Sequence, residues 1–365
     1  MTALHLGLIG PVPPPSGGMA MQTEQLARLL RAEGLLVTQV VSNAPYRPAW
    51  VERLPGLRAL HRLFFYVFAV WRLAGRVDAI HLMANSGWSW QLFAAPVLWL
   101  APLRDCPVIV NYRGGEAGNY FRRAWRRVRP SLNRAALVVV PSGFLRAAFA
   151  EYGQSTRIIP NIVDLSVFRP VQGTTGPGRP FTLVITRNLE PIYGIETAIE
   201  ALARVLQSAP ETRLRIAGSG PQESELRTLA STLDISHAVE FTGRLDRRGI
   251  AQLYAEADAM LNPTTVDNMP NSVIEALACG LPVISTAVGG VPYIVRDEDT
   301  ALLVPVNDAT AMAAAILRLQ DDEAIRGHLR ERGLAEVAQY AWPAVREQWL
   351  AAYDEVAGRK SGTLV

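Results

Sequence analysis

Short apolar segments alternate with longer amphipathic segments along most of this chain. The short segments have the length and the branched side chains of buried strands, and the longer ones repeat apolar residues at helical spacing. Strands are predicted at residues 4–9, 37–41, 79–82, 108–110, 137–140, 182–185, 213–217, 239–241, 259–261 and 282–284. Helices are predicted at residues 19–33, 194–207, 222–233, 250–257, 309–320 and 342–357. This alternation favours the α/β class, with parallel sheets that carry helices on both faces.

The alternation is interrupted at residues 166–180, where proline and glycine replace the helical spacing. Such a composition is typical of a linker and predicts two domains, at residues 1–168 and 169–341. The last predicted helix, extended to residues 342–358, is amphipathic and aromatic, and we expect it to return and pack on the first domain. In a chain of 365 residues each domain is long enough to bury a core of its own.

The composition excludes several classes of protein. With 49% hydrophobic and 19% charged residues, the chain is not of the disordered type. Its two cysteines, Cys106 and Cys279, argue against a disulfide framework and for a reducing compartment. The net charge of +3 is too small to indicate nucleic-acid binding. No secretory signal is apparent at the start, so we expect a cytoplasmic protein.

Residues 262–290 combine a polar loop, a short helix and two carboxylates. The loop at residues 267–271 opens a helix, and Ser272 and Glu275 have the spacing of a capping box. A helix start after a polar loop offers free N–H groups to a diphosphate, and the carboxylates of Asp267 and Glu275 suit paired hydroxyls. An ordinary capped helix explains the same pattern when this segment is taken alone.

Several short motifs along the chain occur in an order that one family shares. They are Gly17-Gly18-Met19, residues 161–164 with 168–170, Arg187, residues 217–221, 241–245 and 267–290, and residues 301–305 followed by Asp308. In their order and spacing the chain resembles the retaining glycosyltransferases of family 4. The resemblance implies the GT-B fold, which has two facing Rossmann-like domains with a deep interdomain cleft.

The resemblance also implies an activity. The expected reaction is transfer of a hexose, with retention of configuration, from a nucleotide-diphosphate sugar to a lipid-linked or growing glycan acceptor. Such a reaction belongs to polysaccharide or glycoconjugate biosynthesis, and no metal cofactor is expected. Catalysis in this picture rests on orientation of the reactants and on charge stabilisation at the diphosphate, without a strong base.

The family's pattern assigns roles to individual residues of this chain. It implies that Arg187 binds the donor diphosphate, that Asp267 holds hydroxyls of the transferred sugar, and that Glu275 binds the ribose. The other residues implied at the donor are Gly17, Gly18, Tyr193, Gly218, Arg244, Leu245, Asn268, Met269, Pro270, Asn271, Ser272 and Val273.

Three positions depart from the family's pattern. Tyr193 stands where the family usually has a lysine, and Asp267 stands where it normally has the longer glutamate. Arg113 stands where the family often has a histidine, and with Asp267 and Arg187 it completes the predicted catalytic set. Because arginine stays protonated, we expect Arg113 to bind phosphate or an anionic acceptor, or to replace the charge lost at Tyr193. A structural ion pair with Glu116 is the alternative.

The predicted acceptor side lies in the first half of the chain. Arg113 and Gly114 follow one predicted strand, and His81 is expected at the carboxyl end of another, where the ligands of such sheets bind. A histidine that is fully hydrogen-bonded inside the core is the alternative for His81.

Two segments of the first half combine arginine with aromatic residues. Residues 57–75 are rich in phenylalanine and tryptophan with arginines between them, and residues 121–129 carry five arginines and a tryptophan. This pattern suits an anionic membrane surface and predicts peripheral contact with the inner face of the membrane. Core helices with solvated edges are the alternative. Residues 88–103 are uncharged but too short to span a bilayer.

Two other functions are compatible with the sequence. A nucleotide-sugar-binding or scaffold protein of a glycan assembly system, with impaired catalysis, is favoured by the three departures. Retention of Arg187, Glu275 and the Gly17-Gly18 loop favours the enzyme instead. A related GT-B epimerase fits residues 268–280 less well. The donor base, the sugar, the acceptor and the linkage are not determined by the sequence.

Overall fold

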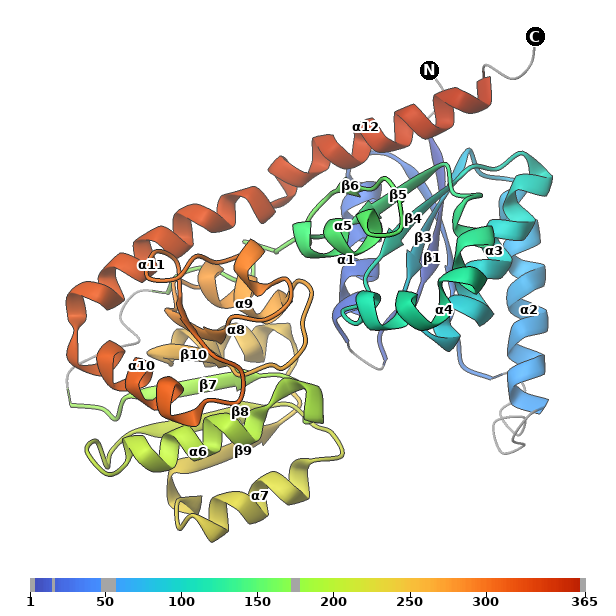
Figure 1. Cartoon of the computed structure of the whole chain (residues 1–365). Coiled ribbons are helices and arrows are strands. Elements are labelled where there is room, and N and C mark those ends of the chain that lie inside the picture. The colour runs from blue at the N-terminus through green and yellow to red at the C-terminus, as the bar shows by residue number, and fades with distance from the viewer. Residues whose placement is uncertain (1–3, 15–16, 47–56, 172–177, 362–365) are drawn as a thin grey trace. The chain divides into compact units, whose positions relative to one another are not determined.

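A computed structural model of the chain describes residues 4–14, 17–46, 57–171 and 178–361. The contacts of the chain divide it into two compact units. Unit 1 is Met1–Ile162 with Trp342–Val365, and unit 2 is Val163–Ala341. Each unit contains one six-stranded sheet with helices packed against it (Figure 1). The predicted α/β class is therefore confirmed for both.

Unit 1 is built on the sheet order β2-β1-β3-β4-β5-β6, in which all neighbouring strands are parallel. Its strands are β1 (His5–Gly10), β2 (Leu36–Val41), β3 (Ala79–Ala84), β4 (Val108–Tyr112), β5 (Leu137–Val140) and β6 (Arg157–Ile158). Its α-helices are α1 (Gly18–Ala32), α2 (Leu57–Ala74), α3 (Ala95–Leu100), α4 (Ala117–Leu132), α5 (Gly143–Ala150) and α12 (Trp342–Ser361). A π-helix, η2 (Trp90–Ala94), and a 3-10 helix, η3 (Ala101–Arg104), flank α3.

The alternating side chains of these strands divide the core of unit 1 into two layers, as expected for a sheet with helices on both faces. One layer packs strand residues such as Ile80 and Val110 against α2, α3, α4 and α5. The other packs Leu8 and Ile109 against α1 and α12. The last helix of the chain thus packs against the sheet of unit 1, as the aromatic positions of its sequence predict.

Unit 2 has the sheet order β12-β11-β10-β7-β8-β9, again with parallel neighbours. Its strands are β7 (Thr182–Thr186), β8 (Arg213–Ala217), β9 (Val239–Gly243), β10 (Ala259–Asn262), β11 (Val283–Thr286) and β12 (Leu302–Val304). Its α-helices are α6 (Ile195–Val205), α7 (Glu223–Thr232), α8 (Arg247–Ala255), α9 (Asn271–Ala278), α10 (Ala309–Asp321) and α11 (Glu323–Val337). On one side of the sheet the chain adds β8 and β9 next to β7, and on the other side it adds β11 and β12 next to β10. The strand order therefore reverses between β7 and β10. That reversal is where open α/β sheets bind ligands.

The expected domain boundary after residue 168 lies inside unit 2. Val163 forms a bridge with Ala341, and the buried ring of Phe168 packs near Tyr254 of α8. The segment that begins at Val163 therefore belongs to the core of unit 2, and the chain passes between the units after Ile162 and before Trp342. Of the expected linker at residues 166–180, residues 172–177 lie outside the described residues, and the rest belongs to unit 2.

No helix in the described part of the chain is both long enough and apolar enough to cross a bilayer.

Candidate active site

The loops that follow β7 and β10 meet at the point where the strand order of unit 2 reverses. Arg187 comes directly after β7, and residues 263–270 connect the end of β10 to α9. Because β7 and β10 are neighbouring parallel strands, their carboxyl ends bring these two segments to one edge of the sheet. The residues expected to bind the donor therefore come from adjacent elements.

The guanidinium of Arg187 is held by an amide and a carboxylate. Its Nε and Nη2 donate to Asn262 Oδ1 at 3.1 and 2.8 Å, and Nη2 also forms an ion pair with Asp267 Oδ2. Asn262 is fully buried and donates its own Nδ2–H to Ser285 Oγ at 2.8 Å. The Arg187 and Asp267 side chains are only 12% and 13% exposed, so both charges are largely withdrawn from water. Arg187 is thus fixed in direction before any ligand arrives.

Tyr193 stacks on the same guanidinium. The Cζ atom of Arg187 lies 4.9 Å from the centre of the Tyr193 ring. Burial raises the pKa of the Tyr193 hydroxyl, which Arg187 opposes, so the ring stays neutral. Two of the three departures from the family's pattern, Tyr193 and Asp267, therefore meet on Arg187.

Two glycines allow the backbone of this region to pack closely. A Cβ atom on Gly218 would lie 1.8 Å from the carbonyl oxygen of Arg187, and one on Gly290 would lie 1.6 Å from that of Asn268. The N–H of Gly290 donates to the carbonyl oxygen of Asp267 at 3.0 Å. Any side chain at these positions would displace the segments that carry Arg187 and Asp267. Gly218 therefore has a packing role beside its predicted role at the donor.

The predicted capping box at Ser272 and Glu275 is wrong. The helix α9 begins at Asn271 behind Pro270, and no side chain caps its first turn. Ser272 lies inside that turn, where its Oγ is buried without a hydrogen-bond partner and its carbonyl accepts from the Tyr254 hydroxyl at 3.1 Å. The helix starts earlier than the spacing suggested because Pro270 already has the extended conformation of a residue that precedes a helix. Pro270, the residue before the helix, therefore offers no side-chain oxygen to the first N–H groups of α9.

Glu275 lies in the second turn of α9, and its environment is unusual for a carboxylate. Burial raises the pKa of Glu275 to about 7, against the opposing charges of Arg247 and Arg187. Among the residues that the structure describes, none forms a hydrogen bond or an ion pair with this carboxyl group. A half-buried acceptor with no partner is a group that a hydroxylated ligand can satisfy.

The remaining residues predicted at the donor differ in how accessible they are. Asn268 and Met269 are buried, and the N–H of Asn268 donates to Asp267 Oδ1 at 2.7 Å. The side chain of Val273 is fully buried in the core of unit 2, and Leu245 is half-buried against the same cluster. Arg244 is exposed and donates to Ser219 Oγ at 3.3 Å.

In unit 1, Gly17 lies in the open at the amino end of α1. Its backbone is extended, and no described atom lies within 4 Å of the position that a Cβ would take. Gly18, the first residue of α1, is exposed as well. Packing within the described part of unit 1 therefore gives no reason for a glycine at position 17.

Arg113 follows β4 and is held by two neutral amides. Its Nε donates to Asn111 Oδ1 at 3.1 Å, and its Nη1 donates to Asn161 Oδ1. Within the described ranges no carboxylate forms an ion pair with it, so the alternative pairing with Glu116 is not observed. Burial lowers the pKa of Arg113 to about 10, which leaves it protonated near neutral pH. The neighbouring Gly114 packs tightly, since a Cβ there would lie 2.4 Å from Ser86 Oγ.

His81 is an interior residue, and its expected position at the end of a strand is wrong. It lies within β3 with its ring buried, Nδ1 2.7 Å from the Tyr353 hydroxyl and Nε2 3.0 Å from Asn111 Nδ2. Burial, assisted by the charge of Arg113, lowers the pKa of His81 to about 3. His81 is therefore neutral and anchors α12, and Asn111 connects it to Arg113.

Sequence reasoning missed three asparagines that position these arginines: Asn111, Asn161 and Asn262. Asn111 and Asn262 stand at or next to the carboxyl end of an otherwise apolar strand. A polar residue at that position was the available signal, because parallel strands of this kind place ligand-binding groups at their carboxyl ends.

These features define a class of protein before any comparison. A parallel α/β sheet that carries an arginine, acidic residues and a helix start where its strand order reverses is typical of nucleotide-binding domains. A family profile described as Glycosyl transferases group 1 matches residues 172–335, and one described as Glycosyltransferase Family 4 matches residues 16–167. The chain belongs to the glycosyltransferases that these profiles describe, and its two units are those of the GT-B class.

Individual relatives agree with this assignment. The phosphatidyl-myo-inositol mannosyltransferase of Mycobacterium tuberculosis H37Rv is 26% identical over 97% of this chain and 98% of its own length. The sucrose-phosphate synthase of Thermosynechococcus elongatus, 24% identical, superposes with a TM-score of 0.78 over 97% of this chain and 100% of its own. Anabaena HepE in complex with UDP, 18% identical, superposes with a TM-score of 0.76 over 96% of this chain and 100% of its own. Two further relatives, 33% and 32% identical over shorter stretches, are matched over only 21% and 42% of their lengths.

Proposed function

We propose that this glycosyltransferase moves a hexose, with retention of configuration and without a metal ion, from a nucleotide-diphosphate sugar to a lipid-linked or growing glycan acceptor. The observation that carries the proposal is the fixed Arg187–Asp267 pair at the strand-order reversal of unit 2, together with Glu275, whose carboxyl group pairs with none of the described residues. Both cysteines are buried and neither forms a disulfide bond, which agrees with the cytoplasmic location that we propose with it.

The donor side follows from the chemistry of the three residues. The guanidinium fork of Arg187 matches the oxygens of a diphosphate and stabilises the negative charge that grows on it as the sugar leaves. Asp267, held by Arg187, accepts hydroxyls of the transferred sugar. Glu275 accepts the two ribose hydroxyls, and the uncapped N–H groups of α9 face the diphosphate charge. The UDP complex of HepE makes uridine nucleotides the first probes to test.

The Asp297-Glu298-Asp299 segment has the Asp-x-Asp spacing of a metal-binding motif, but both aspartates already accept hydrogen bonds within the protein. Asp299 accepts from Arg332 Nε at 2.7 Å and from Arg296 Nε at 2.8 Å, and these bonds lower its pKa to about 2. Asp297 Oδ1 accepts from the N–H of Leu303 at 2.8 Å. This supports a reaction in which Arg187 and the α9 helix start, rather than a metal held here, carry the diphosphate charge.

On the acceptor side, we propose that Arg113 binds an anionic group such as a phosphate. Among the described residues it donates to neutral amides and has no carboxylate partner, and a cation in such a position gains most from an anionic ligand. A hollow of about 460 Å³ lies close by, lined by Asn85, Ser86, Gly87, Glu116, Asn119, Tyr120 and Arg123. Polar side chains and one tyrosine suit a hydroxylated head group.

A direct test uses the purified protein with a panel of nucleotide sugars. We expect one donor to raise the melting temperature, to be hydrolysed slowly alone, and to yield a product with the anomeric configuration of the donor by NMR. Addition of EDTA is expected to leave the rate unchanged. An inverted product, or a rate that EDTA abolishes and magnesium restores, would contradict the mechanism. Donor binding without hydrolysis or transfer would instead support the scaffold function.

The affinity for nucleotide is expected to rise with pH through the ionisation of Glu275. With a pKa of about 7 the carboxyl is neutral in acid and charged in base, and only the carboxylate accepts hydrogen bonds from both ribose hydroxyls. Titration calorimetry should show the Kd for the nucleoside diphosphate falling about tenfold from pH ~6 to pH ~8. The Glu275→Gln variant should bind more weakly and without this pH dependence.

Stability gives an independent readout of the same carboxyl. Because its pKa in the folded protein lies above the ordinary value of 4.5, the group favours folding at low pH, and this contribution is lost as the pH rises through about 7. Glu275→Gln should therefore melt at a higher temperature than the wild type at pH ~8 and at nearly the same temperature at pH ~5. Equal melting temperatures at both values would show that Glu275 titrates normally.

A further inference from the structure

One side of α2 is apolar although its side chains are exposed in the described structure. Phe64 and Phe68, one helical turn apart, have 68% and 53% of their surface exposed, and Leu60 and Trp71 extend the same stripe. The opposite side of the helix supplies Tyr66, Val70 and Leu73 to the core of unit 1. Packing of the core needs only that second side, so it does not explain the exposed stripe.

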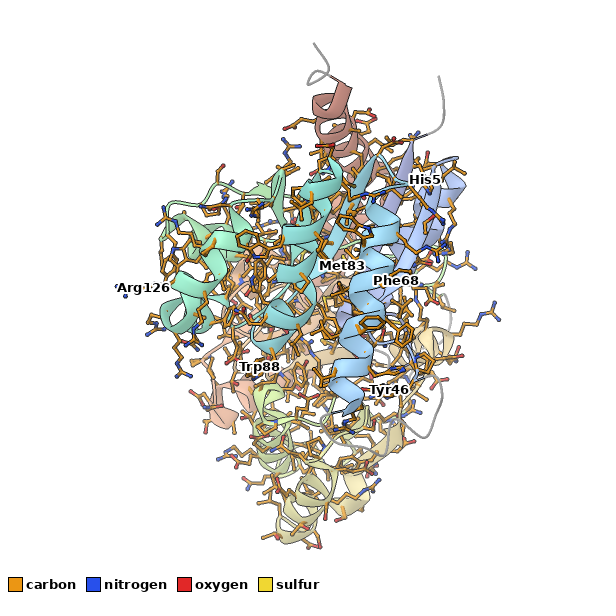
Figure 2. The ribbon with its side chains drawn as sticks, turned by 90° about the vertical axis from the view of Figure 1, so that its right-hand side faces the viewer. His5, Tyr46, Phe68, Met83, Trp88 and Arg126 are labelled. Atoms are coloured by element: carbon orange, nitrogen blue, oxygen red, sulfur yellow. The ribbon has the colours of Figure 1, made fainter. Side chains whose placement is uncertain are left out.

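The exposed apolar surface continues onto the neighbouring elements. α3 packs against both α2 and α4, and Figure 2 shows the three helices side by side on the face turned toward the viewer, with Phe68, Trp88 and Arg126 labelled. Trp88 has 78% of its surface exposed, and Trp99 and Leu103 are exposed as well. We call the exposed residues of this surface the α2–α4 face: Leu60, Phe64, Phe65, Phe68, Trp71, Trp88, Trp99 and Leu103, with the arginines around them.

The charge of this region is strongly one-sided. Residues 57–134 hold twelve arginines against three acidic residues, while the rest of the chain holds 24 basic and 30 acidic residues. Five of the arginines are exposed on α4: Arg122, Arg123, Arg126, Arg127 and Arg129. The weak net charge of the whole protein therefore conceals a basic surface on unit 1.

Arginines also lie directly over the exposed rings. The Cζ atom of Arg104 is 4.8 Å from the centre of the Trp71 ring, and that of Arg134 is 3.8 Å from the Trp99 ring. Arg72 lies 5.7 Å from the Phe68 ring. Aromatic rings under guanidinium groups form a surface that is apolar at the ring level and cationic just above it.

We propose that the α2–α4 face docks on an anionic lipid bilayer, with its aromatic side chains inserted at the level of the head groups. Exposed Trp, Phe and Leu partition into that zone, and the surrounding arginines pair with lipid phosphates. A second copy of the chain is a poor partner, because a two-fold interface would place arginine against arginine. Peripheral docking needs no spanning helix.

The docking face reaches the edge of the sheet that carries Arg113. Trp88 follows the loop at Asn85 and Ser86, which contacts Gly114, and the N–H of Arg113 donates to the carbonyl of Ala84 at 2.9 Å. A head group anchored in the same bilayer would therefore be presented near Arg113. This last step rests on the proposed function, whereas the docking itself does not.

Flotation of the purified full chain with vesicles tests the docking without any turnover. We expect the protein to float at low salt with phosphatidylcholine–phosphatidylglycerol vesicles and much less with phosphatidylcholine alone. Phe64→Ser/Phe68→Ser should lower the partition coefficient by about tenfold for each ring. Arg126→Glu/Arg127→Glu should lower it on the order of tenfold or more at low salt and much less at high salt.

Matched variants outside the face provide the controls. Leu36→Ser removes an exposed leucine from β2, and Arg169→Glu/Arg248→Glu reverses two exposed charges in unit 2; both should float like the wild type. Since all of these side chains are exposed, circular dichroism should show unchanged folding. Absence of flotation with anionic vesicles, or equal flotation of Phe64→Ser/Phe68→Ser and Leu36→Ser, would overturn the proposal. So would a dimer in sedimentation that Phe64→Ser/Phe68→Ser dissociates.

Discussion

Replacement of Arg187 by alanine is expected to lower kcat/KM for the nucleotide-sugar donor by about 10² to 10³-fold. Arg187 is the cation fixed at the carboxyl end of β7 by Asn262 and Asp267, and Tyr193, which stacks on it, supplies no charge of its own. Since Tyr193 replaces the usual lysine, that position supplies no second positive charge. Removal of Arg187 therefore leaves the departing diphosphate without a charged side chain from either position. Steady-state kinetics with the donor identified by thermal shift measures the effect.

Stability must be separated from catalysis in this variant, because the Arg187–Asp267 pair is largely buried. Removal of one partner leaves an unpaired carboxylate, which costs about 3–5 kcal/mol. The double variant Arg187→Ala/Asp267→Asn removes both charges and should recover most of the lost melting temperature while staying inactive. Arg248→Ala, an exposed arginine in the same unit, should keep its full rate. An Arg187→Ala enzyme with a near-normal rate would refute the role of Arg187.

Replacement of Arg113 is the second change with a large expected effect. Arg113→Gln should lower kcat/KM for an anionic acceptor by about 10²-fold, since it removes a partly buried cation that would form a charge-assisted bond. Arg113→Lys keeps the charge but not the planar fork and should lose less. Transfer assays with a phosphate-bearing acceptor and a neutral analogue measure the difference.

Two measurements distinguish an Arg113 that binds the acceptor from one that only supports the fold: the melting temperature and the rates with anionic and neutral acceptors. Arg113 also donates to Asn111 and Asn161, so its loss leaves two amide oxygens without their donor. A purely structural arginine would lower the melting temperature of both variants and would affect the anionic and neutral acceptors equally. A larger loss with the anionic acceptor than with the neutral one would support direct binding.

The strands and their order of appearance were predictable because buried parallel strands are continuous apolar runs. β5 and β8 match the predicted residues at both ends, and the other predicted strands differ only at their termini. The helix α11 was missed because few of its side chains are buried, with Leu329 and Val337 among them, so its apolar spacing is weak. β6, which has only two residues, carries no periodic signal at all.

Predictions that relied on local spacing alone were less reliable. Ser272 and Glu275 have capping-box spacing, but Pro270 precedes the helix, which therefore begins at Asn271 and places Ser272 inside the first turn. His81 stands in an apolar strand, and nothing near it in the sequence indicates that its ring nitrogens are used by Tyr353 and Asn111, which lie far away along the chain. Contacts between residues so far apart in the sequence cannot be predicted from local spacing.

The sequence by itself determined the α/β class, the family, and the residues that are candidates for the chemistry, since these follow from periodicity and from motifs at fixed spacing. Only the tertiary structure decided how those residues are paired. It brought Asp267 and Tyr193 into contact with Arg187, and it exposed the apolar stripe of α2. Among the described residues it gave the Glu275 carboxyl group no hydrogen-bond partner and gave Arg113 no carboxylate partner. The physical reason is that burial and charge pairing depend on neighbours brought together by the sheet order, and that order is fixed by packing of the whole unit.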